Sequence, residues 1–319
     1  MNLIVDTKKL YEPVNYVKNL GGKNTRGLFI DYIQNLLNND NNPNTKFFKK
    51  DLNDCHNSSL LIDDIQDDSL KRRGQACAHL IFSTSLTLNA GYLKIFDILI
   101  NVDNIYPKNI SEKIKNCYLK SLKNIHIGQG LDILWSKEKK IVSLDDYFFM
   151  IDNKTGILFH LICELCLISK GNTIYHDDIL NMAKHFGRFF QIRDDYINLT
   201  KPSYWNVKGF CQDFDEKKCS YIFTKLLKNK KNNNIFEHLC KYEKLSQENK
   251  IDFYNLLYQN KVLHEVYFDL EKYKQNIINI EKKITNSENP SEFLKMFFKK
   301  LDYNLPIEPK NIKKCLMFL

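Results

Sequence analysis

Proline is confined to a few positions in this chain, and the gaps between them limit what it can fold into. Three long stretches, residues 44–106, 108–201 and 203–289, contain no proline. Proline inside a helix removes a hydrogen bond and clashes with the preceding turn, so such stretches are free to form long helices. Apolar residues also recur at helical spacing, as in Ile114, Tyr118, Leu122 and Ile125, and sustained strand alternation is missing. The sequence therefore predicts an all-α protein.

We expect a single domain over residues 1–319, because no internal repeat or linker stands out and 43% hydrophobic residues suffice for a large core. The first helices are expected near residues 8–20, 24–39, 46–69, 75–102, 109–137, 143–168, 175–200 and 215–228. More helices are expected from there to the end.

Charge and cysteine content narrow the class of protein. A net charge of +9 favours anionic partners, which include nucleic acid, a membrane surface or phosphorylated small molecules. Nucleic acid ranks last, because no finger or recognition motif is present. The nine cysteines lack the spacing of a disulfide scaffold, and Cys163 and Cys166 lie in an apolar run that suits core packing. With no signal-peptide pattern and no membrane-span segment, we expect a soluble cytoplasmic protein.

Four aspartates, at positions 63, 64, 67 and 68, follow an apolar run that should be buried. On a helix, Asp63 and Asp67 would share one face while Asp64 and Asp68 share the next. Two carboxylates about 6 Å apart repel by roughly 3 kcal/mol at an effective dielectric near 20, so a cation should compensate them. Mg²⁺ suits this role, because it is commonly held by one or two carboxylates together with substrate phosphates. For the cluster alone, however, an acidic, solvated helix end is the favoured interpretation.

A second acidic pair, Asp194-Asp195, also ends an apolar helical pattern. If both helices line one cavity, the two sets of carboxylates can hold several Mg²⁺ ions around a diphosphate. Basic residues stand nearby: Arg72 and Arg73 follow the first cluster, and Arg26 opens an early helix after two glycines. Guanidinium groups and helix N-termini both suit phosphate. A solvated arginine pair is an equally simple reading, and a core histidine is the simpler reading of His56.

Taken in order, these segments resemble one known family. The segments that carry the likeness are GGKNTR at 21–26, HNSSLLIDDIQDDSLKRRG at 56–74, GQGLDILW at 128–135, KTGILF at 154–159, FFQIRDDYINL at 189–199 and KGFCQDF at 208–214. They are similar to the trans-prenyltransferase, or polyprenyl synthetase, family and within it to the eukaryotic geranylgeranyl diphosphate synthases. The resemblance implies an isoprenoid-synthase helical bundle around a central apolar cavity.

The resemblance also implies residue roles. The metal ligands would be Asp63, Asp64, Asp67 and Asp194, for three Mg²⁺ ions, with Asp195 in the second motif and Asp68 supporting. The allylic diphosphate would be surrounded by Arg72, Lys154, Thr155, Gln191, Lys208 and Lys218. A metal-free pocket for isopentenyl diphosphate would be formed by Lys23, Arg26, His56 and Arg73.

The implied reaction joins isopentenyl diphosphate to an allylic diphosphate, here farnesyl diphosphate, to give geranylgeranyl diphosphate. Ser58 and Ser59 are small where shorter-product enzymes of the family carry bulky aromatics, so the product pocket should extend past them. By the same resemblance its floor would come from Ile95, Phe96 and His126. The family likeness also implies a homodimer.

Some residues depart from the family pattern. Asn198 stands where many members have a third aspartate, which puts metal binding there in doubt. Asp215-Glu-Lys-Lys218 replaces the familiar TEGK, and Ile222 replaces a proline, so closure of this loop should differ. A terpene cyclase would share the fold and the acidic motifs but needs no second diphosphate pocket. A non-catalytic regulatory subunit has typically lost an acidic motif, and here both are present.

Overall fold

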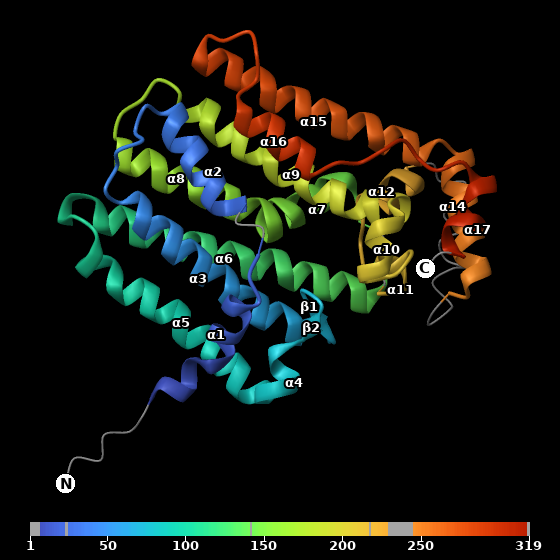
Figure 1. Ribbon diagram of the computed structural model, residues 1–319, viewed down its shortest axis with the longest axis horizontal. Coiled ribbons are helices and arrows are strands. Elements are labelled where there is room, and N and C mark those ends of the chain that lie inside the picture. Colours follow the sequence, from blue (N-terminus) through green and yellow to red (C-terminus); the bar gives the residue numbers. More distant parts are fainter. Residues whose placement is uncertain (1–6, 23–24, 141, 217, 229–244, 318–319) are drawn as a thin grey trace. The chain divides into compact units, whose positions relative to one another are not determined.

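A computed structural model describes residues 7–22, 25–140, 142–216, 218–228 and 245–317, without the side chains of residues 207 and 208. Almost every element in this part of the chain is a helix, which confirms the all-α prediction (Figure 1). By internal contacts the chain divides into two compact units. The prediction of a single domain stays a prediction.

Unit one comprises residues Met1–Lys120 and Leu161–His176. Its elements are η1 (Thr7–Tyr11), α1 (Glu12–Asn19), α2 (Thr25–Leu36), α3 (Thr45–Gln66), β1 (Lys71–Arg72), β2 (Gln75–Ala76), α4 (Ala78–Phe82), α5 (Thr84–Ile105), the first part of α6 (Lys108–Glu138) and the end of α8 (Ile157–Lys170). Helices α3 and α5 lie side by side (Figure 1). They approach closely at Gly91, where an added Cβ would lie 3.4 Å from the carbonyl oxygen of Ser58.

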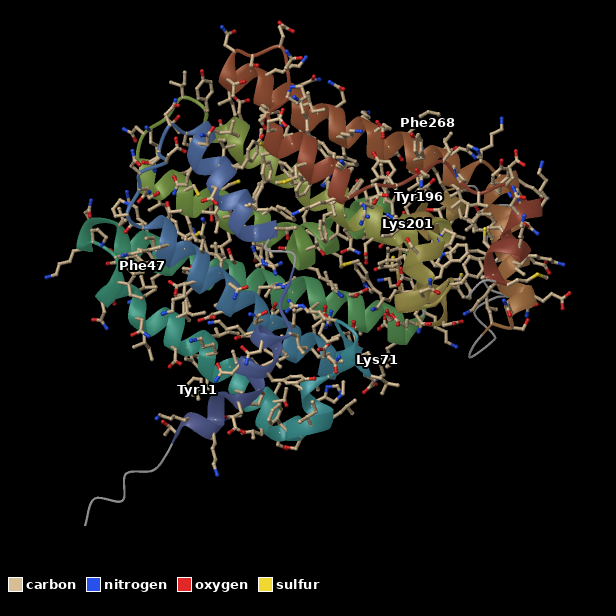
Figure 2. The ribbon with its side chains drawn as sticks, in the orientation of Figure 1. Tyr11, Phe47, Lys71, Tyr196, Lys201 and Phe268 are labelled. Atoms are coloured by element: carbon tan, nitrogen blue, oxygen red, sulfur yellow. The ribbon has the colours of Figure 1, made fainter. Side chains whose placement is uncertain are left out.

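Unit two comprises residues Ser121–His160 and Asp177–Leu319. It holds the rest of α6, then α7 (Leu144–Ile151), the π-helix η2 (Asp152–Gly156), the start of α8, α9 (His176–Thr200), α10 (Pro202–Lys208), α11 (Gln212–Asp215), α12 (Tyr221–Leu227), α14 (Gln247–Gln259), α15 (Val262–Thr285), α16 (Glu292–Lys300) and α17 (Pro309–Leu316). Aromatic side chains fill much of its core: Phe186 packs on Phe297, and Phe189 packs on Tyr303. Figure 2 shows Tyr196 and Lys201 near the end of α9, and both hydrogen-bond to residues 302–304.

Several of the predicted helices differ from the observed ones, among them the one expected at 215–228, where α12 begins only at Tyr221. The helix expected at 46–69 ends at Gln66, and the one expected at 75–102 is preceded by a short hairpin and broken at Ser83, whose φ is 74°. The helix expected at 143–168 is interrupted by η2. In each case a turn or a local change of helix type occurs without proline, so the proline pattern could not predict it.

The positions of Cys163 and Cys166 agree with the expected core packing. No disulfide joins the eight described cysteines, and Cys163 and Cys166 are fully buried in α8, as core packing requires. Among the described helices, none combines the length and the apolar character that crossing a bilayer needs.

Candidate active site

The first acidic cluster sits where α3 stops. Asp67 caps the helix, and Asp68 turns into the left-handed region with φ 48°. The Ser69 N–H then donates to the Asp64 carbonyl at 2.9 Å, and the Asp68 N–H donates to the Ile65 carbonyl at 3.4 Å. This pair of bonds is the Schellman motif, in which one left-handed residue ends a helix. The expected pairing of Asp64 with Asp68 on a helix face therefore does not form.

The hairpin that follows brings Arg72 back onto the acidic cluster. Its Nε donates to Asp64 Oδ1 at 2.8 Å, and its Nη2 donates to Asp63 Oδ2 at 3.1 Å and also reaches Asp64. Asp64 is only 1% exposed, so its charge would be costly without this partner. Burial alone would lower the pKa of Arg72, but the hydrogen bond and charge of Asp64 outweigh it and raise the pKa.

The turn of the hairpin holds Arg73 in a conformation that side chains rarely adopt. In the register Lys71 pairs with Ala76 and Arg72 with Gln75, so Arg73 and Gly74 form a two-residue turn with φ values of 54° and 82°. Positive φ at both central residues is the type I′ pattern. Figure 2 shows Lys71 on this hairpin, where it is exposed. The strained turn aims Arg73 away from Arg72: its Nη1 donates to the Val17 carbonyl at 3.1 Å.

Arg26 and Arg73 line one basic cavity in unit one. The cavity has a volume of about 460 Å³ and is lined by Lys18, Gly21, Gly22, Arg26, Gly27, Lys49, Lys50, Asn53, Asp54, Asn57 and Arg73. Five of these residues are cationic and one is acidic. Burial and the nearby Arg73 lower the pKa of Arg26 to about 10. Because the two guanidinium charges repel, an anion bound between Arg26 and Arg73 would stabilise both charged forms.

His56 lies close to the same cations. Burial, together with the charges of Arg26, Arg73 and Arg72, lowers its pKa well below the ordinary value, so the ring is neutral at pH 7. A neutral imidazole still carries one N–H donor for a phosphate oxygen. The structure thus brings three of the four residues expected around isopentenyl diphosphate near one another. The fourth, Lys23, lies outside the described residues.

The residues expected to set product length are placed differently from one another. Ser58 is fully buried against α5, whereas Ser59 is half-buried and donates its hydroxyl to the His56 carbonyl at 2.8 Å. Ile95 is 7% exposed, but Phe96, the next residue on α5, is 58% exposed. Adjacent helical residues point about 100° apart, which accounts for the difference in burial. That the two share one pocket floor stays a prediction. His126 belongs to unit two and is exposed.

The second acidic cluster lies in α9 and is held by neutral donors. The Tyr204 hydroxyl donates to Asp194 Oδ1 at 2.7 Å. Asp195 accepts from the Tyr147 hydroxyl at 2.7 Å, the Tyr221 N–H at 2.7 Å and Gln191 Nε2 at 3.0 Å. Burial and the neighbouring Asp213 nevertheless raise the pKa of Asp195 to about 7, against the effect of those donors. This carboxylate would gain from a cation or a proton.

The π-helix η2 carries Lys154 and Thr155. Short π segments inside α-helices are frequent at functional sites, because they shift the side chains that follow by one position. Lys154 Nζ pairs with Asp132 Oδ2 at 2.5 Å. Thr155 donates to Gln191 Oε1 at 2.6 Å, and Gln191 donates on to Asp195, so a continuous hydrogen-bonded chain joins η2 to the second acidic cluster.

Two glycines make room for η2. A Cβ added to Gly128 of α6 would lie 2.3 Å from the Lys154 backbone nitrogen, and one added to Gly187 of α9 would lie 2.4 Å from Gly156 Cα. Real Cβ atoms do not approach backbone so closely. In contrast, a Cβ on Gly130 would meet nothing within 4 Å. Glycine is thus needed at 128 for close packing, and not at 130.

The loop after the second cluster is tied down by Asn198. Its Oδ1 accepts from the Asp213 N–H at 3.4 Å. Asn198, whose role in metal binding was in doubt, therefore has a structural contact. Lys218 pairs with Glu216 at 2.8 Å. Ile222 is the second residue of α12, a helix start that proline also tolerates. The Lys208 side chain and all of Lys217 lie outside the described residues.

Several residues of this site escaped the sequence-based analysis. Tyr147, Tyr204 and Asp213 contact the second acidic cluster. No motif marks the two tyrosines, whereas Asp213 stands within the KGFCQDF segment. Asp132, the partner of Lys154, stands within the GQGLDILW segment, so its position in that segment was the available signal.

The donor set suits Mg²⁺ in kind. Within the described residues, no three acidic, histidine or cysteine side chains converge closely enough to form a metal site alone. Mg²⁺ needs only one or two carboxylates when substrate phosphates and water complete its shell. Asp63 and Asp64 place carboxylate oxygens, the ligand type that Mg²⁺ prefers, side by side at the end of α3, where Arg72 contacts both.

Comparison with known proteins gives consistent results. The description of the polyprenyl synthetase family matches residues 7–257. Preasperterpenoid A synthase PvPS of Talaromyces verruculosus is 33% identical over 293 residues, which are 88% of this chain and 36% of that protein. Geranylgeranyl pyrophosphate synthase 3 of Zymoseptoria tritici is 37% identical over 211 residues, 65% of this chain and 56% of that protein. The chain therefore spans between about a third and about half the length of these relatives.

A solved structure shares the fold. The geranylgeranyl pyrophosphate synthetase from Pyrococcus horikoshii Ot3 aligns with a TM-score of 0.80 at 20% identity, covering 93% of this chain and 90% of that one. The shared fold agrees with the helical bundle that the resemblance implies. Because the family match extends from residue 7 to residue 257 of 319, the chain belongs to the polyprenyl synthetase family.

Proposed function

We propose that this protein is a trans-prenyltransferase that condenses isopentenyl diphosphate with an allylic diphosphate, preferably farnesyl diphosphate, to give geranylgeranyl diphosphate. One observation carries the proposal: unit one contains two different kinds of anion site. Asp63 and Asp64 form a carboxylate set suited to a metal-bound diphosphate. Arg26 and Arg73 line a separate cavity whose cations suit a diphosphate without metal. A condensation needs both kinds of site, because only one substrate loses its diphosphate.

The carboxylates of Asp63, Asp64, Asp67 and Asp194 would hold Mg²⁺, three ions by family resemblance. Mg²⁺, when bound, supplies positive charge that makes diphosphate a better leaving group. Arg72, Lys154, Thr155, Gln191, Lys208 and Lys218 would bind and orient the allylic diphosphate, while Lys23, Arg26, His56 and Arg73 would orient the isopentenyl diphosphate. Orientation of this kind lowers the barrier by holding the reacting carbons together.

The bond changes then follow. The allylic carbon–oxygen bond breaks and its electron pair leaves with diphosphate, while Lys154 stabilises the negative charge that develops on that diphosphate. The double bond of isopentenyl diphosphate attacks that cation to form the new carbon–carbon bond. A proton is then lost from the adjacent carbon to the released diphosphate, which restores a double bond. Asp195, held by Gln191 and Tyr147, keeps the second acidic cluster in place.

The assay uses the purified chain with labelled isopentenyl diphosphate and Mg²⁺, and with dimethylallyl, geranyl or farnesyl diphosphate in separate reactions. We expect label to enter a twenty-carbon diphosphate, most efficiently from farnesyl diphosphate. If no allylic diphosphate longer than the one supplied becomes labelled, the proposal is rejected.

Product length is tested by a pair of serine variants. Ser59 is half-buried one turn before Asp63, so in Ser59→Phe we expect the ring to shorten the product pocket that the family resemblance implies, and the mean product length should fall. Ser58→Phe is the contrasting variant: Ser58 is fully buried against α5, so its ring should lower the melting temperature instead. Product lengths are measured by chromatography after phosphatase treatment. A folded Ser59→Phe variant with unchanged products would contradict this role.

A second candidate function is cyclisation of an allylic diphosphate, because the name of the Talaromyces verruculosus relative is that of a preasperterpenoid synthase. A cyclase consumes one diphosphate substrate and has no use for the cation-lined cavity of Arg26 and Arg73. The same assay separates the two, since a cyclase would release a hydrocarbon that organic solvent extracts without phosphatase.

We further propose a cytoplasmic homodimer. The free cysteines suit a reducing compartment. On α5, Tyr92, Phe96 and Ile100 recur every four residues and are 37%, 58% and 68% exposed. Such an apolar stripe on one helix face suits packing against a second copy. Sedimentation of the wild type and of Phe96→Glu would test it, with a dimer expected only for the wild type.

A further inference from the structure

The cation-lined cavity of unit one contains a lysine whose charge is only partly balanced. Lys18, in the last turn of α1, lines the cavity beside Arg26 and Arg73. Its Nζ lies 3.3 Å from Asp54 Oδ1. The other oxygen of Asp54 lies 3.1 Å from Lys94 Nζ. One carboxylate therefore contacts two ammonium groups, and Lys94 also interacts with the charge of Asp51.

The two lysines differ in what they face. The side chain of Lys18 is 48% exposed, whereas that of Lys94 is 22% exposed and lies outside the lining of the cavity. Asp54 itself is 4% exposed, so it is fixed in the core between them. An ammonium has three donors, and Asp54 uses one donor of Lys18. The remaining donors can serve a ligand in this cavity or in a second cavity of about 380 Å³, which Lys18 lines together with Asp54 and Lys94.

The other cations of the cavity show why this matters. Lys49 is already paired with Asp31 at 2.6 Å. Within the described part of the chain, neither Arg26 nor Arg73 forms an ion pair with a carboxylate. Through repulsion, the charge of Arg73 lowers the pKa of Arg26, and both charges lower the pKa of His56. The charge of Arg72 lowers the pKa of Arg73 in the same way. A buried carboxylate shared by two lysines beside two such guanidiniums leaves a local excess of positive charge. That excess is stabilised when an anion with several oxygens enters.

We propose that Lys18 is a further diphosphate-binding residue of this cavity and that Asp54 is the residue that positions it. The proposal rests on the proposed function, because it takes isopentenyl diphosphate as the occupant. The simpler alternative is that Lys18 only stabilises the carboxyl end of α1, where lysine is favourable in any helix. That alternative predicts a change in melting temperature and none in substrate binding.

The test measures binding and turnover in the full chain. Calorimetric titration with isopentenyl diphosphate, in chelator and without an allylic substrate, reports the cavity alone. For Lys18→Gln we expect the Kd and the KM for isopentenyl diphosphate to rise about tenfold, the low end for a charge-assisted hydrogen bond at a half-exposed site, while kcat stays within about twofold. Lys18→Arg should restore most of the affinity.

Lys94→Gln is the matched control, because it removes the same charge from the same carboxylate outside the cavity lining. We expect its KM to change less than about twofold, since Lys94 is not part of the cavity lining and would not contact the diphosphate. Asp54→Asn tests whether Asp54 positions Lys18. It makes the cavity more positive, so charge alone predicts tighter binding, whereas loss of positioning predicts a KM about threefold higher.

Equal effects of Lys18→Gln and Lys94→Gln, or unchanged binding in Lys18→Gln, would overturn the proposal. So would tighter binding in Asp54→Asn. These outcomes are separate from the proposed function: a wild type that condenses substrates while Lys18→Gln binds normally rejects only Lys18. A wild type that binds isopentenyl diphosphate through Lys18 without condensing it rejects only the reaction.

Discussion

The carboxylates of the two acidic segments are stabilised by different kinds of hydrogen-bond donor. At the end of α3, a guanidinium neutralises the charge: Arg72 bonds both Asp63 and Asp64. In α9, neutral groups donate to the carboxylates: Tyr204 to Asp194, and Tyr147, Gln191 and a backbone N–H to Asp195. Burial and the nearby Asp213 raise the pKa of Asp195 to about 7, against the effect of its donors. A guanidinium thus contacts the first carboxylates, whereas the buried Asp195 accepts from neutral donors and would gain from a cation.

This difference teaches how each segment is built. The first depends on a turn, since the Schellman end at Asp68 and the hairpin turn at Arg73 and Gly74 deliver Arg72 to the cluster. The second depends on close backbone packing, since Gly128 and Gly187 let η2 approach, and η2 carries Thr155 to Gln191. Substitutions should therefore fail differently in the two segments.

The largest effect is expected when either segment loses its leading carboxylate. Asp63→Ala and Asp194→Ala should each lower the condensation rate by about 10³-fold, because each removes electrostatic stabilisation of the leaving diphosphate. Chelation of Mg²⁺ should abolish the reaction. Incorporation of labelled isopentenyl diphosphate provides the measurement, with the exposed Asp252→Ala as the matched control. Full turnover in Asp194→Ala alone would mean that the second segment is structural, and the comparison would break.

The next effect separates charged from neutral compensation through stability. Arg72→Met leaves Asp64 buried without its partner, so the free energy of unfolding in chelator should fall by about 3 kcal/mol. Tyr147→Phe removes one of three donors to Asp195 and should cost about 1 kcal/mol. Urea denaturation of both variants measures the difference. Added Mg²⁺ should recover part of the loss in Arg72→Met, and equal losses in the two variants would remove the distinction.

Sequence patterns predicted the helices and both acidic segments because these depend on local spacing. The proline-free stretches and the apolar periodicity were enough for α6 and α9, whereas the end of α3 and the start of α5 were misplaced. The hairpin turn at Arg73 was missed because a positive φ in arginine has no composition signal. Tyr147 and Tyr204 were missed because their contacts with Asp195 and Asp194 span 48 and 10 residues of sequence. Long-range partners of this kind follow from packing, which a single sequence does not display.

The smallest of the three effects concerns the packing that supports the second segment. Gly128→Ala would place a Cβ 2.3 Å from the Lys154 nitrogen, so η2 must move by about 1 Å, and a shift of that size can cost about 10²-fold in kcat, or about 2.7 kcal/mol. Gly130→Ala, two residues away on α6, meets nothing within 4 Å and should keep full activity. It should also raise the melting temperature, because alanine favours a helix more than glycine does. Steady-state kinetics and thermal melts of the two variants make the comparison. Similar kcat values would show that η2 tolerates displacement, and that the second segment does not depend on backbone contact as the first depends on Arg72.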